Sequence, residues 1–187
     1  METHALEGGF TQPEVQAAHA FRGIMTALAR PGTVHRLSGA APPAPLSAAA
    51  AACLLALCDT DTPVHLAGDT DTPAVRDWMA FHTGAPRVDR HDCAFAVGRW
   101  EQLLPLTDYP IGTPAYPDRS ATLIVELDAL THSGVTLRGP GIRDTAHLSL
   151  PDISAFQRNH RQYPLGLDFV FACGDQVAAL PRSTEVN

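Results

Sequence analysis

The sequence predicts an α/β fold, a three-layer-like sandwich with a mixed sheet. Three observations lead to this prediction. Apolar residues make up 45% of the 187 residues and charged residues 18%, which is enough apolar material for a core. Helix-like and strand-like segments alternate early in the chain. Gly174-Asp175 separates the last two strand-like segments with the spacing of a tight hairpin, so antiparallel pairing should close the sheet. We expect residues 1–187 to form one domain.

The N-terminal segments begin with a predicted flexible arm over residues 1–10. A helix should follow, with Thr11 as its N-cap, Pro13 in its first turn and Glu14 completing a capping box. Pro31-Gly32 should end it. Its apolar positions recur at helical spacing and predict a buried stripe of Ala17, Ala18, Phe21, Ile24, Met25 and Leu28.

Short strands and helices are then expected to alternate. Residues 34–37 predict a strand, and Ser47 is a suitable cap for a helix over 48–58. The pentapeptide DTDTP occurs twice, at 59–63 and 69–73, and predicts two similar turns. The remaining expected elements are a strand over 64–67, a helix from Pro73 to about His82, strands over 93–97, 121–127 and 134–138, a loop over 110–120, a helix from Asp152 to about Arg161, and strands over 167–172 and 176–180.

Composition excludes several classes of protein. The net charge is −7 and the basic residues are dispersed, so no nucleic-acid-binding face is expected. No apolar run reaches the length of a membrane span, and no basic segment precedes an apolar stretch near Met1, so we expect a cytoplasmic location. The four cysteines form no CxxC pair and lie in apolar surroundings, which predicts buried reduced thiols and no metal site.

All 13 basic residues are arginine, and the chain contains no lysine. A Schiff base to pyridoxal phosphate and a Walker A lysine are therefore both excluded on this chain. We expect no cofactor.

Two groups of residues are candidates for binding an anion. Arg138 precedes Gly139-Pro140-Gly141, where glycines would let backbone N–H groups approach an anion, although a plain tight turn explains the same residues. Arg182 lies beside two hydroxyl residues near the end of the chain, and it can either bind phosphate or fasten the C-terminus.

Histidine and aspartate side chains offer a different chemistry. His82 ends a predicted helix, where it can interact with the last carbonyls or face a ligand. Asp61, with Asp59, Asp69 and Asp71, can act as an acid–base pair or hold a hard cation, but aspartate before proline is also an ordinary turn former. No nucleophile motif such as GxSxG accompanies them.

Several segments, in order along the chain, resemble the PhnH family, the H subunit of the bacterial carbon–phosphorus lyase core complex. The matches run over about residues 10–186, and the regions 87–108 and 152–161 fit less clearly. The segments are 21–32 (FRGIMTALARPG), 57–64 (LCDTDTPV), 81–86 (FHTGAP), 112–115 (GTPA), 121–124 (ATLI), 137–142 (LRGPGI), 164–168 (PLGLD), 173–174 (CG) and 180–184 (LPRST).

The resemblance implies a reduced type I pyridoxal-phosphate transferase fold, a homodimer, and partner subunits G, I and J with the ATP-binding-cassette-like subunit L. It also implies a part in displacing adenine from ATP by a phosphonate, the reaction of α-D-ribose 1-methylphosphonate 5-triphosphate synthase. It assigns no catalytic residue to this subunit. The absence of lysine fits a scaffold that has lost pyridoxal chemistry.

Three hypotheses for function follow. The first is an assembly subunit that is inactive alone. The second is a subunit that grips ATP or a phosphonate through Arg138, Gly139, Gly141 or Arg182. The third is a stand-alone metal-dependent or His/Asp hydrolase that uses His82 with Asp59 or Asp61.

Overall fold

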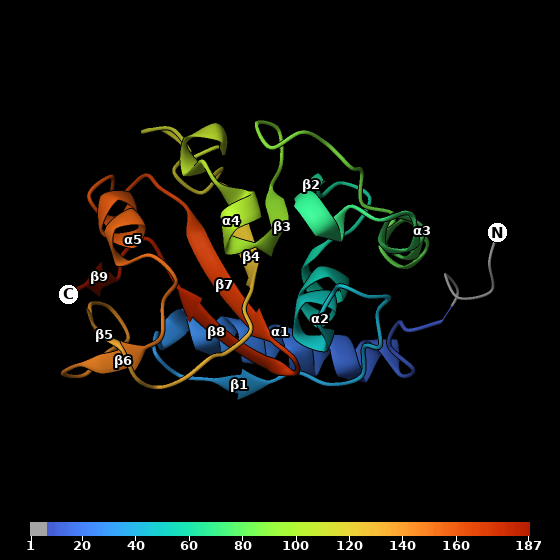
Figure 1. Cartoon of the computed structure of the whole chain (residues 1–187), viewed down its shortest axis with the longest axis horizontal. Coiled ribbons are helices and arrows are strands. Elements are labelled where there is room, and N and C mark those ends of the chain that lie inside the picture. The colour runs from blue at the N-terminus through green and yellow to red at the C-terminus, as the bar shows by residue number, and fades with distance from the viewer. Residues whose placement is uncertain (1–6) are drawn as a thin grey trace.

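The computed structural model describes residues 7–187 and shows an α/β architecture built on a mixed six-stranded sheet (Figure 1). Strand order in this sheet is β1-β8-β7-β4-β3-β2. Strands β2, β3, β4 and β7 are parallel, whereas β8 and β1 pair antiparallel. The sheet strands are β1 (His35–Arg36), β2 (Val64–Leu66), β3 (Phe95–Arg99), β4 (Thr122–Glu126), β7 (Asp168–Cys173) and β8 (Gln176–Leu180).

Helices and a smaller sheet cover the two faces of the main sheet. One apolar cluster packs residues of α1, α2 and α3 on one face, and a second packs α4, α5 and the small sheet on the other. The predicted sandwich with a mixed sheet is therefore confirmed at the level of an α/β fold. The covering elements are α1 (Pro13–Ala29), α2 (Ala48–Leu57), α3 (Pro73–His82), α4 (Trp100–Leu103), α5 (Ile153–His160), two 3₁₀ turns η2 (Gly68–Thr70) and η3 (Leu106–Asp108), and the strands β5 (Val135–Arg138), β6 (Ala146–Leu148) and β9 (Glu185–Val186).

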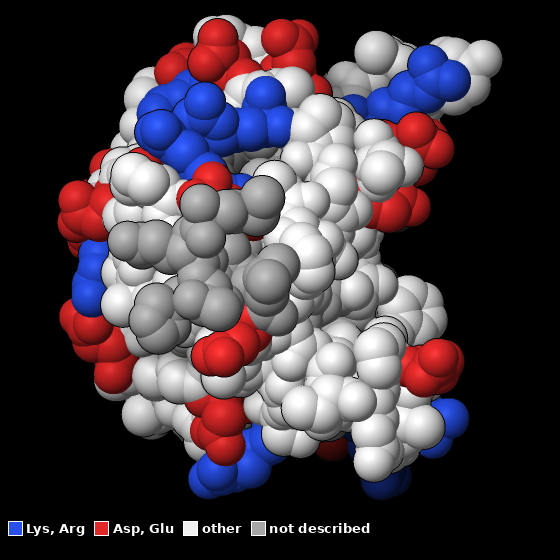
Figure 2. All heavy atoms as spheres, turned by 90° about the vertical axis from the view of Figure 1, so that its right-hand side faces the viewer, with Lys and Arg blue, Asp and Glu red and all other residues white. Residues whose placement is uncertain are grey.

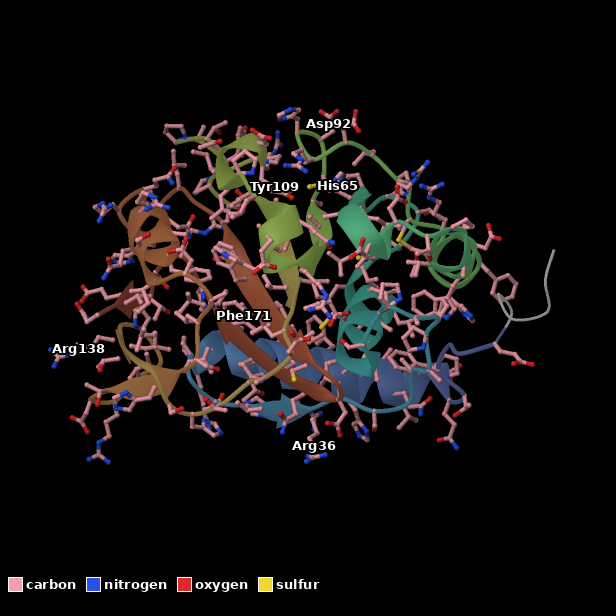
Figure 3. The ribbon with its side chains drawn as sticks, viewed as in Figure 1. Arg36, His65, Asp92, Tyr109, Arg138 and Phe171 are labelled. Atoms are coloured by element: carbon pink, nitrogen blue, oxygen red, sulfur yellow. The ribbon has the colours of Figure 1, made fainter. Side chains whose placement is uncertain are left out.

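Alternating side chains divide the central strands between the two clusters. In β4, Leu123 and Val125 face one cluster and Ile124 the other, and all three are buried. Strand β7 follows the same rule with Phe169 and Phe171, whose rings stack 6.4 Å apart (Figure 3). A continuous apolar run is thus the signature of a strand buried on both faces.

Caps define where the helices begin. The Ser47 hydroxyl accepts from the Ala50 N–H at 3.1 Å, and Thr72 and Asp152 cap α3 and α5 in the same way, as predicted. The predicted cap of the first helix is wrong. Helix α1 starts after Gln12, whose backbone N–H donates to Gln16 Oε1 at 2.8 Å. Gln16 thus takes the role expected of Glu14, whereas no side chain caps the helix in the way expected of Thr11.

The expected apolar stripe of α1 is only partly buried. Ile24 lies in the core beside the small residues Ala20 and Ala27, which let the helix approach α2 and β8 closely. Phe21 and Met25 point outward instead and are 49% and 46% exposed. Ala18 is exposed as well, so three residues predicted for the core lie on the surface.

The predicted arm falls partly outside the described residues, since positions 1–6 are not described. Positions 7–10 are held against the fold, which contradicts a loose arm there. The Gly8 carbonyl accepts from the Ala41 N–H at 2.9 Å, and Phe10 packs against the first apolar cluster. Both clusters share one sheet, which supports our proposal that residues 1–187 form one domain.

Candidate functional site at the carboxyl edge of the sheet

A cavity of about 330 Å³ lies where all four parallel strands end. Ligands of open α/β sheets bind in the crevice outside the carboxyl ends of the strands. We call this cavity the carboxyl-edge pocket. Its lining residues follow β2, β3, β4 and β7 or begin α2: Pro45, Ser47, Asp69, Thr70, Arg99, Gln102, Glu126, Leu127 and Gly174.

Glu126 is the last residue of β4 and places a carboxylate in this pocket. Its Oε1 accepts a hydrogen bond from the backbone N–H of Ser47 at 2.7 Å, so the acid group sits at the N-terminus of α2. Burial raises the pKa of Glu126, while the Ser47 hydrogen bonds and the positive charge of Arg99 oppose that rise. The side chain is thus a half-buried acceptor whose charge is costly but partly compensated.

Arg99 ends β3 and supplies the cation of the pocket. Its guanidinium donates to both carboxylate oxygens of Asp128, at 3.0 and 3.2 Å. Both side chains of this ion pair are largely exposed, so the pair adds little to stability. Arg99 can therefore turn toward a ligand without a large loss.

Gln102 lies against the 3₁₀ turn that follows β2. A Cβ on Gly68 would come within 2.3 Å of Gln102 Cδ, so the glutamine side chain would have to move if this residue were not glycine. The Gln102 Oε1 atom is buried and accepts no hydrogen bond from any residue between 7 and 187. Buried acceptors without a donor are uncommon and mark strain or a site for a further partner.

Burial argues against thiol chemistry at three of the four cysteines. All four cysteines are free, and burial raises the pKa of Cys58 to about 12 and that of Cys93 to about 11. Burial also raises the pKa of Cys53, which lies near Glu126. These thiols stay protonated near neutral pH and are not nucleophiles. The prediction of buried reduced thiols is confirmed for these three cysteines.

The glycines of the predicted anion turn serve close packing. A Cβ on Gly141, at φ +81°, would come within 1.9 Å of the Ala29 carbonyl oxygen, and one on Gly139 would approach the Ser183 carbonyl oxygen at 3.1 Å. Arg138 pairs across strands with Glu185 and projects outward from the small sheet (Figure 3). A phosphate role for Arg138 stays a prediction, and the turn has a structural explanation without it.

The guanidinium of Arg182 donates hydrogen bonds to protein acceptors at the amino edge of the sheet. Its Nε donates to Asp168 Oδ1 at 3.1 Å, one terminal nitrogen donates to the Pro117 carbonyl at 2.8 Å, and the other donates to Asp168 Oδ2 and to Ser120 Oγ. We call Arg182, Asp168, Ser120 and Pro117 the amino-edge cluster. This geometry favours the second of the two expected roles, fastening the C-terminal segment.

Helix α3, which ends at His82, and β2, which begins shortly after Asp61, lie toward the right of Figure 1, whereas β5, which ends at Arg138, lies at the left. His82 Nε2 is 3.1 Å from the Glu7 carbonyl oxygen and therefore helps to hold the N-terminal segment. The Asp61 backbone N–H donates to Asp59 Oδ1 in an ordinary turn. The six candidate residues thus do not form one site.

Metal binding lacks a ligand set in the described part of the chain. No three His, Cys, Asp or Glu side chains between residues 7 and 187 come together in a way that could hold an ion. Asp71 is instead shared by Arg76 and Arg87. Figure 2 shows the side of the molecule on which α3 lies, where basic side chains gather beside acidic ones. None of the helices over residues 7–187 is long and apolar enough to cross a bilayer.

Sequence patterns alone do not identify most of the residues that line the carboxyl-edge pocket. The sequence offers Asp69 as a turn residue or as part of an acid–base or cation site and Ser47 as a cap, but it does not single out Arg99, Gln102 or Glu126. One signal could have found two of them: Arg99 and Glu126 are charged residues that directly end apolar strands. Gln102 has no comparable signal, because only the fold brings it against Gly68.

Comparisons with known proteins agree with the resemblance seen in the sequence. A model of the bacterial phosphonate metabolism protein family (PhnH) matches residues 8–187. A Rhizobium meliloti protein named alpha-D-ribose 1-methylphosphonate 5-triphosphate synthase subunit PhnH is 40% identical over 195 residues, covering 100% of this chain and 98% of the relative. A Stutzerimonas stutzeri protein named putative C-P lyase subunit protein HtxG is 28% identical over 176 residues, covering 90% of this chain and 84% of that relative. The chain belongs to the PhnH family of bacterial phosphonate metabolism proteins.

Proposed function

We propose that this chain is a subunit of a carbon–phosphorus lyase system and acts in the synthesis of α-D-ribose 1-methylphosphonate 5-triphosphate. The observation that carries the proposal is the 40% identity, over essentially the full length of both chains, to the Rhizobium subunit of that name. The second relative, named as a putative C-P lyase subunit, points to the same pathway.

Within such a system the chain acts as an assembly or substrate-holding subunit and has no turnover of its own. Two observations support this role. The chain has no lysine, so a fold of the pyridoxal-phosphate transferase type could not form an internal aldimine here. Phe21 and Met25 leave an apolar patch exposed on α1, and such patches are typical of surfaces that meet other proteins. The expected partners are a second copy and subunits G, I, J and L, in the cytoplasm.

Co-expression tests the proposal directly. A tagged form of this chain, expressed with the G, I and J subunits of the same bacterium, should copurify with them at a fixed ratio through affinity and size-exclusion steps. A chain that elutes alone under these conditions would contradict the assembly role.

Growth tests the pathway itself. A strain that lacks the gene should fail to grow on methylphosphonate as its sole phosphorus source, and the intact gene should restore growth. Growth on inorganic phosphate serves as the control. A deletion strain that still grows on methylphosphonate would overturn the proposed pathway.

A further inference from the structure

The first turn of α2 borders the carboxyl-edge pocket, yet three of the N–H groups there, those of Ser47, Ala49 and Ala50, already donate to protein acceptors. The Ser47 N–H donates to Glu126 Oε1 at 2.7 Å, the Ala49 N–H to the Gly174 carbonyl at 2.9 Å and the Ala50 N–H to Ser47 Oγ at 3.1 Å. A free helix N-terminus would favour a phosphate. Here the position of the anion is taken by the carboxylate of Glu126.

Acceptors outnumber free donors on the wall of the pocket. Glu126 and Asp69 bring two carboxylates against the single guanidinium of Arg99, which also pairs with Asp128. Gln102 adds a buried carbonyl oxygen that accepts no hydrogen bond within residues 7–187. A phosphate would meet net repulsion here, whereas a ligand that brings hydroxyl donors would satisfy the unused acceptors.

We propose that the carboxyl-edge pocket binds the vicinal hydroxyl groups of a pentose and leaves the phosphates of the same ligand outside. The inference rests on the proposed function, because the product named for the Rhizobium relative contains a ribose. An ionised carboxylate has about four lone-pair sites, so Glu126 can keep the Ser47 contact and still accept from two hydroxyls. A carboxylate beyond the carboxyl end of a parallel strand holds a ribose hydroxyl in other open α/β sheets.

Gln102 then acts as the second acceptor of the site. Its Oε1 has almost no exposed surface in the free chain, so the amide must turn toward the cavity before a ligand hydroxyl can donate to it. Arg99 also lines the pocket, but its guanidinium is paired with Asp128, so part of its charge is already compensated before a ligand binds.

Nuclear magnetic resonance titrations of the full chain test the proposal with three probes: adenosine, 2′-deoxyadenosine and inorganic tripolyphosphate. We expect adenosine to shift the backbone signals of Ser47, Gln102 and Glu126. The deoxy analogue should bind about tenfold more weakly, since one charged hydrogen bond is lost. Tripolyphosphate should leave these three signals unchanged.

Glu126→Gln is the matched variant, because an amide oxygen can still accept from the Ser47 N–H and keep α2 in place. It should weaken adenosine binding about tenfold. Glu101→Gln changes an exposed carboxylate on the neighbouring helix that does not line the pocket, and it should bind adenosine as the wild type does.

Three results would overturn the inference: equal affinity for adenosine and the deoxy analogue, displacement of adenosine by tripolyphosphate, or no shift at these residues at millimolar adenosine. The growth test separates the pentose site from the proposed function in phosphonate metabolism. A chain that restores growth on methylphosphonate but gives one of these results refutes only the pentose site, whereas failure to restore growth refutes the pathway.

Discussion

The two edges of the main sheet use the same kinds of side chain in different ways. At the amino edge, Arg182 and Asp168 satisfy each other, and Ser120 and Pro117 take further donors of the guanidinium. At the carboxyl edge, Glu126 and Arg99 line a cavity instead of pairing fully, and Gln102 has no donor among the described residues. If the carboxyl-edge pocket binds a ligand as we propose, hydrogen-bond satisfaction, and not residue type, separates the structural cluster at one edge from the binding site at the other.

Replacing Arg182 by alanine should have the largest effect on stability. The Arg182 and Asp168 side chains are only 12% and 24% exposed, so the change leaves a poorly hydrated carboxylate without its partner. We expect the free energy of unfolding to fall by about 3 to 4 kcal/mol, measured by urea denaturation.

Arg36→Ala provides the control for this prediction. Arg36 pairs with Asp175 at 2.6 Å, but its side chain is 73% exposed, so its loss should cost less than about 1 kcal/mol. If Arg182→Ala kept full stability but abolished growth on methylphosphonate, the amino-edge cluster would be a functional site and the comparison would fail.

Gly141→Ala should destabilise the chain by about 2 to 3 kcal/mol. Its φ of +81° is unfavourable for alanine, and the added Cβ would collide with the Ala29 carbonyl oxygen at the end of α1. Thermal unfolding followed by circular dichroism gives the measurement.

Gly174→Ala is the control that measures the cost of a positive φ alone, without the steric clash expected for Gly141→Ala. Gly174 also has a positive φ, +59°, but nothing lies within 4 Å of its added Cβ, so the cost should be only about 1 kcal/mol. Equal losses for the two variants would show that the Gly139-Pro140-Gly141 turn is not packed as described, and an anion role for it would gain support.

Glu126→Gln should change how stability depends on pH. Burial raises the pKa of Glu126 in the folded state, so this group contributes stability at acid pH that is lost as the pH rises through the folded pKa. Glutamine stays neutral. The variant should match the wild type below about pH 4 and become more stable by up to about 1 kcal/mol toward pH 8.

Urea denaturation at the two pH values measures this difference, with Glu101→Gln as an exposed control that should show no such trend. A constant offset between Glu126→Gln and the wild type across the range would mean that Glu126 is not desolvated. The carboxyl-edge pocket would then be as hydrated as ordinary protein surface, and the contrast between the two edges of the sheet would lose its basis.

Local signals predicted the elements of the fold well. Ser47, Thr72 and Asp152 cap helices as expected, because a side-chain oxygen three residues before a backbone N–H acts through local geometry alone. The 121–127 run was assigned to a buried strand and became β4. Of the three strands of the small sheet, the sequence predicts only β5. Strands β6 and β9 are short and exist through their pairing with β5.

The candidate site residues depend on a different kind of information. Gly139 and Gly141 suggested a phosphate turn, but the requirement for glycine came from Ser183 and Ala29, which lie far away in sequence. The outward position of Phe21 on α1 was likewise decided by the small residues on the opposite face of that helix. Contacts between distant segments determine such roles, and no local pattern contains them.

The smallest expected effect belongs to Arg138→Ala. The side chain is exposed and faces Glu185 across two short strands, so the free energy of unfolding should change by less than about 0.5 kcal/mol. Growth on methylphosphonate should remain normal if ligand binding belongs to the carboxyl-edge pocket, whereas Glu126→Gln should slow it. Loss of growth with Arg138→Ala at unchanged stability would instead move the anion site to the small sheet, as the sequence first suggested. A growth assay of both variants, with protein levels checked by immunoblot, therefore compares the two locations directly.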